Sequence, residues 1–268
     1  MSFSPRLVSV FTVVVLGVGV IFLPAQAESS KQELNAKATE LRLFLGRHPE
    51  VPEAHINLGN TYLEEGHDGK PIRHYMAAIK QNPNYAEAYY NLGNVYFKQG
   101  EKEQAINAYK KAIEIKPGLA MAYNGLGNAY VDNKQYAAAI LSYEKAIQIE
   151  PNFREANYNL CAAHLYAKQY AEASTSCERS IKLNNTAKAY NNLGTAYMRT
   201  KQYDKAVDAF NRSLSLDPNI SETHFNLGAV HLVHHKDKKA AEVELSKLQK
   251  LDPQKGHKLA ELIKISGL

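Results

Sequence analysis

The sequence lacks tryptophan, has only two cysteines, and contains none of the short motifs that mark common catalytic sites. We find no phosphate-binding glycine loop, no zinc-protease HExxH motif and no nucleophile elbow. His231, His234 and His235 recur at helical spacing but have no evident acidic or cysteine ligand beside them. The sequence therefore predicts a protein that is not an enzyme, with no catalytic residues, no metal site and no cofactor.

The sequence also lacks a strong excess of charge. Its formal net charge is +5, and the largest local surplus is eight lysines against five acidic residues in 236–268. A nucleic-acid-binding protein usually gathers its basic residues on one face. We interpret these charges as solvated surface and expect no nucleic-acid partner.

Long apolar runs are missing except at the N-terminus. Arg6 precedes an apolar run over 7–23, and Pro24 and the tripeptide Ala25-Gln26-Ala27 follow it. This order is typical of a signal peptide, so we predict that residues 1–27 are a signal peptide cleaved after Ala27. The alternative is an uncleaved membrane anchor, because the run is close to the minimum length for a spanning helix. Both alternatives place the folded part in a periplasm, a lumen or the exterior.

Tyrosine, by contrast, is abundant, and it recurs within a repeated motif. The motif returns at intervals of 34, 34, 34, 33 and 34 residues, as NLGNTY (57–62), NLGNVY (91–96), GLGNAY (125–130), NLCAAH (159–164), NLGTAY (192–197) and NLGAVH (226–231). In 86–119 the apolar residues follow helical spacing on both sides of Gly100, and Pro117 ends the second stretch. Each unit is thus a helical hairpin, and hairpins of this kind bury their apolar faces by stacking on one another.

These units resemble the tetratricopeptide repeat family, which favours particular residue types at eight positions of a 34-residue repeat. Two units match all eight positions, with Tyr89, Leu92, Gly93, Tyr96, Ala105, Tyr109, Ala112 and Pro117 in one, and Tyr123, Leu126, Gly127, Tyr130, Ala139, Tyr143, Ala146 and Pro151 in the other. The resemblance implies an all-α, right-handed superhelix of about six repeats with a capping helix at each end.

The resemblance and the motif spacing predict the domain organisation. Two repeats depart from the pattern: the first has Pro71 where alanine is usual, which requires a late start of its second helix. The sixth is degenerate and has one extra residue before Ala241. Ser30 and Glu33 have capping-box spacing at the start of the first capping helix. The expected segments are 28–51 (capping helix), the repeats 52–85, 86–119, 120–153, 154–186, 187–220 and 221–253, and 254–268 (capping helix).

Both cysteines lie in the fourth repeat. Cys161 takes the eighth position, where other repeats have glycine, and Cys177 takes the twenty-fourth, where others have an aromatic ring. In the family both positions face the seam between the two helices, so a disulfide there would fill the space of the missing ring. An oxidising compartment would preserve such a bond. The alternative is two reduced, buried cysteines.

The family resemblance also implies that the first helices line a concave groove for a protein or peptide partner. Carboxamides recur there and offer donors and acceptors to a peptide backbone. Alternatively, they are repeat consensus that only ties neighbouring helices. The predicted groove residues are Asn57, Asn60, Asn91, Asn94, Asn128, Asn159, Asn192, Asn226, Tyr90, Tyr158, Lys98 and Arg199.

The predicted function is a scaffold that binds an extended peptide or protein, in the role of an assembly or chaperone-like accessory factor outside the cytoplasm. The second repeat position is mostly acidic, which favours a neutral or mildly basic ligand. A structural or oligomerising organiser, tethered to the membrane and using its convex face or its ends, is the alternative. The sequence assigns no oligomeric state, and it predicts membrane contact only through the uncleaved N-terminal segment.

Overall fold

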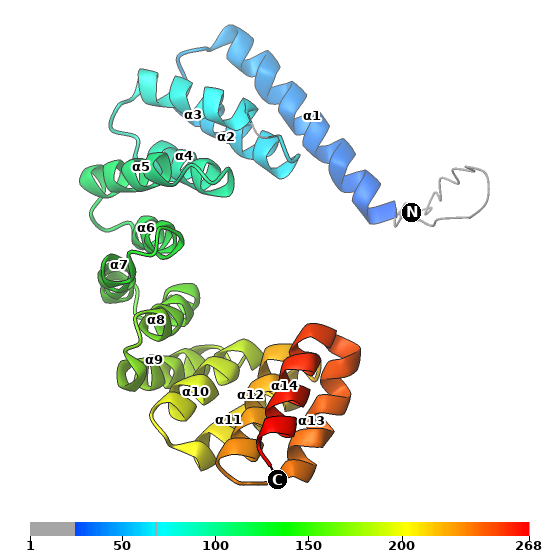
Figure 1. Ribbon diagram of the computed structural model, residues 1–268. Helices are drawn as coiled ribbons and strands as arrows, with labels where there is room; N and C mark the ends of the chain where they lie inside the picture. The colour runs from blue at the N-terminus through cyan, green and yellow to red at the C-terminus, as the bar shows by residue number, and fades with distance from the viewer. Residues whose placement is uncertain (1–24, 68, 268) are drawn as a thin grey trace, which may run out of the picture. The chain divides into compact units, whose positions relative to one another are not determined.

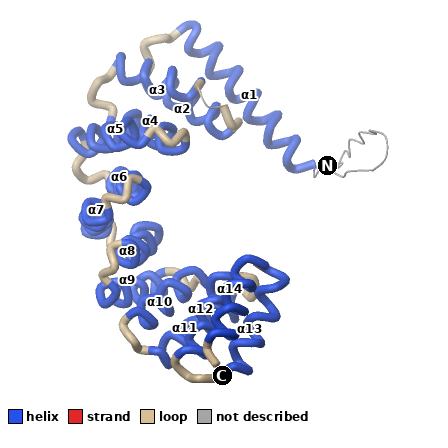
Figure 2. Tube along the Cα trace, in the orientation of Figure 1, coloured by secondary structure: helices blue, strands red, loops and turns tan. Residues whose placement is uncertain are grey.

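The computed structural model describes residues 25–67 and 69–267, and all regular structure in these residues is α-helical (Figure 1; Figure 2). The predicted fold class is therefore confirmed. The apolar run at 7–23, on which the signal-peptide and anchor predictions depend, lies outside the described residues. Among the helices that are described, none combines the length and the apolar character needed to cross a bilayer. The chain divides into two compact units, one ending at Ile115 and the other beginning at Lys116.

The first unit consists of a long helix followed by two hairpins. The helices are α1 (Ala25–Arg47), α2 (Pro52–Glu64), α3 (Lys70–Gln81), α4 (Ala86–Lys98) and α5 (Lys102–Ile115). Ala38 and Leu45 of α1 pack against Leu58 of α2, which covers the end of the stack. The predicted capping box is wrong, because α1 already begins at Ala25 and Ser30 lies inside it.

The second unit consists of four hairpins and a final single helix. The helices are α6 (Ala120–Asp132), α7 (Tyr136–Ile149), α8 (Arg154–Tyr166), α9 (Tyr170–Leu183), α10 (Ala187–Arg199), α11 (Tyr203–Leu216), α12 (Ser221–Val233), α13 (Lys238–Leu251) and α14 (Pro253–Ile265). Leu259 and Ile263 of α14 pack with Leu232 and Leu248 of the last hairpin. This contact covers an apolar face that would otherwise be exposed at the end of the unit.

A glycine of the first helix lies against an aromatic ring of the second helix in four hairpins. A Cβ atom on the glycine would come within 2.5 to 2.7 Å of a ring atom, so these helices approach too closely for any larger residue. The ring is also almost fully buried in each case. This contact explains why glycine and an aromatic residue recur together in the pairs Gly59 and Tyr75, Gly93 and Tyr109, Gly127 and Tyr143, and Gly194 and Phe210.

The two departing hairpins differ in ways that the sequence predicted. In the first, α3 begins after a five-residue connection, 65–69, and Pro71 lies in its first turn, where its missing N–H leaves no broken bond. In the sixth, the connection 234–237 has one residue more than the three-residue connections of the four hairpins before it. Leu259 of α14, with a methyl carbon 2.7 Å from the place of a Gly228 Cβ, takes the position of the missing ring.

A histidine pair in the first hairpin is expected to make the stability of this hairpin dependent on pH. The Nδ1 atoms of His55 and His74 lie 3.2 Å apart. Burial, with neighbouring His55 and Arg73, lowers the pKa of His74 from 6.5 to about 4. Between pH 6.5 and about 4 the unfolded chain therefore binds a proton at His74 that the folded chain does not bind. The contribution of His74 to stability is thus complete above pH 6.5 and is lost as the pH falls toward 4.

We expect this loss to be at most about 2 kcal/mol, because His74 is partly solvated. It is measured by urea unfolding of the full chain at about pH 7 and about pH 4.5. The variant His74→Phe should lose this part of the pH dependence, whereas a control substitution of the exposed His257 by glutamine should keep it. An identical pH dependence in His74→Phe and the parent would contradict the prediction.

Candidate functional site

The first helices of successive hairpins adjoin one another within each unit. In the second unit α6, α8, α10 and α12 lie in that order, each in contact with the next, and in the first unit α2 contacts α4. Side chains from several repeats therefore share one surface. We call this surface, formed by the outward residues of the first helices of a unit, the first-helix face.

The predicted asparagine row connects neighbouring first helices by hydrogen bonds. In the first unit, the Asn91 amide donates to Asn60 Oδ1 over 3.1 Å, and the Tyr75 hydroxyl donates to the same oxygen over 2.7 Å. Burial raises the pKa of Tyr75 to about 12, so its hydroxyl keeps the proton that it donates. The Tyr109 hydroxyl likewise donates to Asn94 Oδ1 over 2.8 Å.

The same arrangement recurs in the second unit. The Asn159 amide lies 3.0 Å from Asn124 Oδ1 and 3.0 Å from Asn128 Oδ1, and the Tyr143 hydroxyl donates to Asn128 over 2.7 Å. Each interaction joins one first helix to the previous one or to its own second helix. The row thus performs the tying role that the sequence left as an alternative, and contact with a ligand remains a prediction.

The other predicted groove residues differ in exposure. Asn226 is buried, with its amide 3.5 Å from Thr195 Oγ1. Asn192 hydrogen-bonds the Tyr158 hydroxyl, whose pKa is nevertheless raised by burial. Tyr90 is partly buried, and its ring centroid lies 6.1 Å from that of Tyr109. The predicted residues that remain exposed are Asn57, Lys98 and Arg199.

Cys161 and Cys177 are joined by a disulfide in the fourth hairpin. Both residues are fully buried, their Cα atoms are 4.9 Å apart, and they pack with Leu193 and Ala209 of the next hairpin. The bond takes the place of the glycine-and-ring contact of the other hairpins. The space of a missing ring is thus occupied by the two sulphur atoms.

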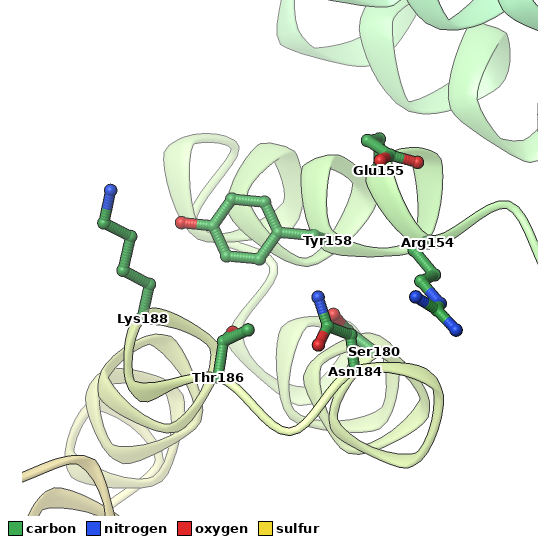
Figure 3. A pocket seen from close by; sticks show the side chains of 7 residues that line it. All are labelled: Arg154, Glu155, Tyr158, Ser180, Asn184, Thr186 and Lys188. Atoms are coloured by element: carbon green, nitrogen blue, oxygen red, sulfur yellow. The ribbon is translucent and has the colours of Figure 1, made fainter. Parts of the chain in front are cut away.

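A pocket of about 220 Å³ opens beside this hairpin, between the start of α8, the end of α9 and the start of α10 (Figure 3). Figure 3 shows the Tyr158 ring above Thr186 and Asn184, with Arg154 and Lys188 on opposite sides. The lining residues are Arg154, Glu155, Tyr158, Ser180, Asn184, Thr186 and Lys188. Sequence analysis predicted only Tyr158 among them as a groove residue, although this repeat is one residue short, a signal of altered packing at its end.

The histidines of the sixth repeat contact neighbouring side chains. The rings of His234 and Tyr203 are stacked, with centroids 3.4 Å apart, while His235 lies 3.7 Å from a carboxylate oxygen of Asp204. Burial lowers the pKa of both His231 and His234. Across the residues that the structure describes, no three His, Cys, Asp or Glu side chains are grouped closely enough to hold a metal ion.

Comparison with protein families identifies the repeated unit. The family model described as Tetratricopeptide repeat matches residues 86–119, 120–153 and 187–220, and a model described as TPR repeat matches residues 70–100. No curated protein matches the chain.

Several solved structures share the fold. YrrB, described as a TPR protein with an unusual peptide-binding site, is 26% identical over 72% of this chain and 98% of its own, with a TM-score of 0.62. MamA from Desulfovibrio magneticus RS-1 is 26% identical over 63% of this chain and 96% of its own, with a TM-score of 0.59.

Two further structures are less similar in sequence. PilF from Pseudomonas aeruginosa is 22% identical over 81% of this chain and 99% of its own, with a TM-score of 0.68. The APC/C hetero-tetramer Cut9-Hcn1 is 23% identical over 90% of this chain, with a TM-score of 0.65, and this chain spans 47% of that one. These two similarities establish a common fold alone.

Proposed function

We propose that this chain, which contains tetratricopeptide repeats, is a non-enzymatic scaffold that binds an extended segment of a protein partner on a first-helix face. The repeat fold supports protein–protein interaction in general. The proposal rests on the contacts between successive first helices, α6 with α8, α8 with α10 and α10 with α12. Outward side chains of four repeats therefore share one surface, and a pocket opens beside α8 and α10. The peptide-binding site named for YrrB supports the same mode of binding.

The proposed role is that of an assembly or chaperone-like accessory factor outside the cytoplasm. The apolar run at 7–23 supports export, and the buried Cys161–Cys177 disulfide is of the kind that persists in oxidising compartments. Contact with the membrane would occur only through the N-terminal segment if that segment is retained.

A second candidate function is an organiser that uses the surface of its second helices. Leu141 of α7 and Val243 of α13 favour it, since both are large apolar residues that are more than half exposed, at 65% and 52%. The two candidates differ in which helices a partner touches. They are therefore separated by mapping the contact surface.

Site-specific photocrosslinking in the cell tests this contact surface. The asparagines are unsuitable probes, because changing them would also break the hydrogen bonds between helices. Exposed residues serve better: Met121 of α6 and Tyr166 of α8 on first helices, and Leu141 and Val243 on second helices as matched controls. Each is replaced in turn by a photoreactive phenylalanine derivative, and the covalent products are identified by mass spectrometry.

We expect crosslinks to a protein partner from Met121 and Tyr166, with little or none from Leu141 and Val243. Crosslinks confined to the second-helix positions would overturn the proposal in favour of the organiser. Turnover of a substrate by the purified chain would contradict its non-enzymatic part.

A further inference from the structure

We call the residue directly before each first helix the junction residue, and in two connections between hairpins it packs into the core. Tyr85 packs with Tyr75 and Leu92, and Phe153 packs with Ala146 and Ala156. Five of the six junction residues are large and apolar, and the sixth is a threonine. In chain order they are Val51, Tyr85, Leu119, Phe153, Thr186 and Ile220.

The exceptional junction residue, Thr186, lies at the pocket. The connection 184–186 has three residues, whereas the other connections between hairpins have four, so the residue that would fill the core is lost. Thr186 instead caps α10, accepting a hydrogen bond from the Ala189 amide over 3.3 Å. Ser180, at the repeat position of Ala146 in the Phe153 cluster, lines the pocket. The pocket thus corresponds to the site that Phe153, the junction residue of the preceding connection, fills beside Ala146.

The size and charge of the pocket define what can enter it. At about 220 Å³ it exceeds the roughly 150 Å³ cavity that can hold a benzene ring. Exposed Arg154 and Lys188 flank it, and within the described residues neither pairs with a carboxylate. Glu155 projects away from Thr186 and Asn184 in Figure 3. With two basic side chains against the single acidic Glu155, the lining carries a net positive charge, although the second repeat position is mostly acidic.

We propose that this pocket binds one large apolar side chain of a protein partner, in a segment where acidic residues flank that side chain. The partner's side chain takes the place of the missing junction residue, and its acidic neighbours meet Arg154 and Lys188. This proposal rests on the scaffold function proposed above and names the chemistry of one contact. The bound segment is thereby held at the junction of the fourth and fifth repeats.

The test uses short acetylated and amidated peptides and the full chain, observed by amide chemical shifts in NMR. One peptide has a central leucine flanked by aspartates, a second has alanine in place of leucine, and a third has lysines in place of the aspartates. We expect saturable shifts at the amides of residues 184–189 with the first peptide. The other two should bind about tenfold more weakly or worse.

Two variants at one position make the assignment specific. Thr186→Leu supplies an apolar junction residue whose burial offsets the lost capping hydrogen bond, so it should abolish the shifts with little change in the melting temperature. Thr186→Ser keeps the capping hydroxyl and the open pocket, so it should bind like the parent. Equal binding by Thr186→Leu and the parent, equal binding of the lysine and aspartate peptides, or no saturable shift in 184–189 would overturn the proposal.

A second copy of the chain is the remaining occupant that the test distinguishes. The chain could dimerise in a way that Thr186→Leu abolishes but that the leucine peptide does not inhibit. That result would assign the pocket to the second copy and overturn the proposal. Failure of the peptide with continued crosslinking from Met121 and Tyr166 would refute the pocket assignment alone. Absence of crosslinks to a protein partner from Met121 and Tyr166 would refute the scaffold function itself.

Discussion

Replacing both cysteines of the fourth repeat by serine is expected to lower the free energy of unfolding by about 3 kcal/mol or more. The disulfide closes a loop of 16 residues, and restriction of the unfolded chain by a loop of this size stabilises by about 3 kcal/mol. The variant would also place two hydroxyls in a fully buried site without an aromatic ring to fill it. Guanidinium unfolding of the oxidised parent and of Cys161→Ser/Cys177→Ser measures the difference.

The other repeats provide the matched control for this change. The double variant Cys161→Gly/Cys177→Tyr installs the glycine and ring that the second and third repeats use, and we expect it to recover much of the lost stability. Cys177→Tyr alone should be less stable than this double variant. The Cβ atom of Cys161 would lie too close to the new ring, as a Cβ at the four glycines would lie within 2.5 to 2.7 Å of a ring atom. A double variant no more stable than Cys177→Tyr alone would show that the two positions do not compensate.

Breaking the buried pair of His224 and Glu244 in the sixth repeat is expected to destabilise the chain by about 3 to 5 kcal/mol. His224 Nδ1 contacts a carboxylate oxygen of Glu244, and its Nε2 donates to the Pro218 carbonyl oxygen over 2.8 Å. The other Glu244 oxygen accepts from Lys247 Nζ over 3.0 Å. Glu244→Leu would leave the imidazole buried beside an apolar group, with its Nδ1 unpaired. Urea unfolding measures the loss.

Two other repeats again suggest the compensating change. The positions of this pair hold tyrosine and alanine in the second and fifth repeats, as Tyr89 with Ala108 and Tyr190 with Ala209. His224→Tyr/Glu244→Ala should therefore be within about 1 kcal/mol of the parent, because apolar replacement of a whole buried pair is often neutral. If the double variant loses as much stability as the sum of its single changes, the two residues do not act as a pair.

Local sequence patterns were enough to predict the repeat, the helical class and the packing inside most hairpins. Gly93 and Tyr109 lie only 16 residues apart in one repeat, and they pack against each other. The repeat alignment shows that Cys161 and Cys177 occupy the same two positions in the fourth repeat. Pro71 and the extra residue before Ala241 also predicted where the helices of two hairpins begin. Local patterns suffice for these features because both partners lie within one repeat.

Roles that depend on a neighbouring repeat could be assigned only from the way the helices pack. The spacing of Asn60 and Asn91 suits a ligand as well as a partner amide, and the docking of α4 on α2 brings them together. The pocket beside Thr186 likewise required α8, α9 and α10 to be placed together, because a shortened connection does not show whether the space closes. Hydrogen bonds and cavities between elements depend on how helices pack, and composition and periodicity do not specify that packing at the scale of single atoms.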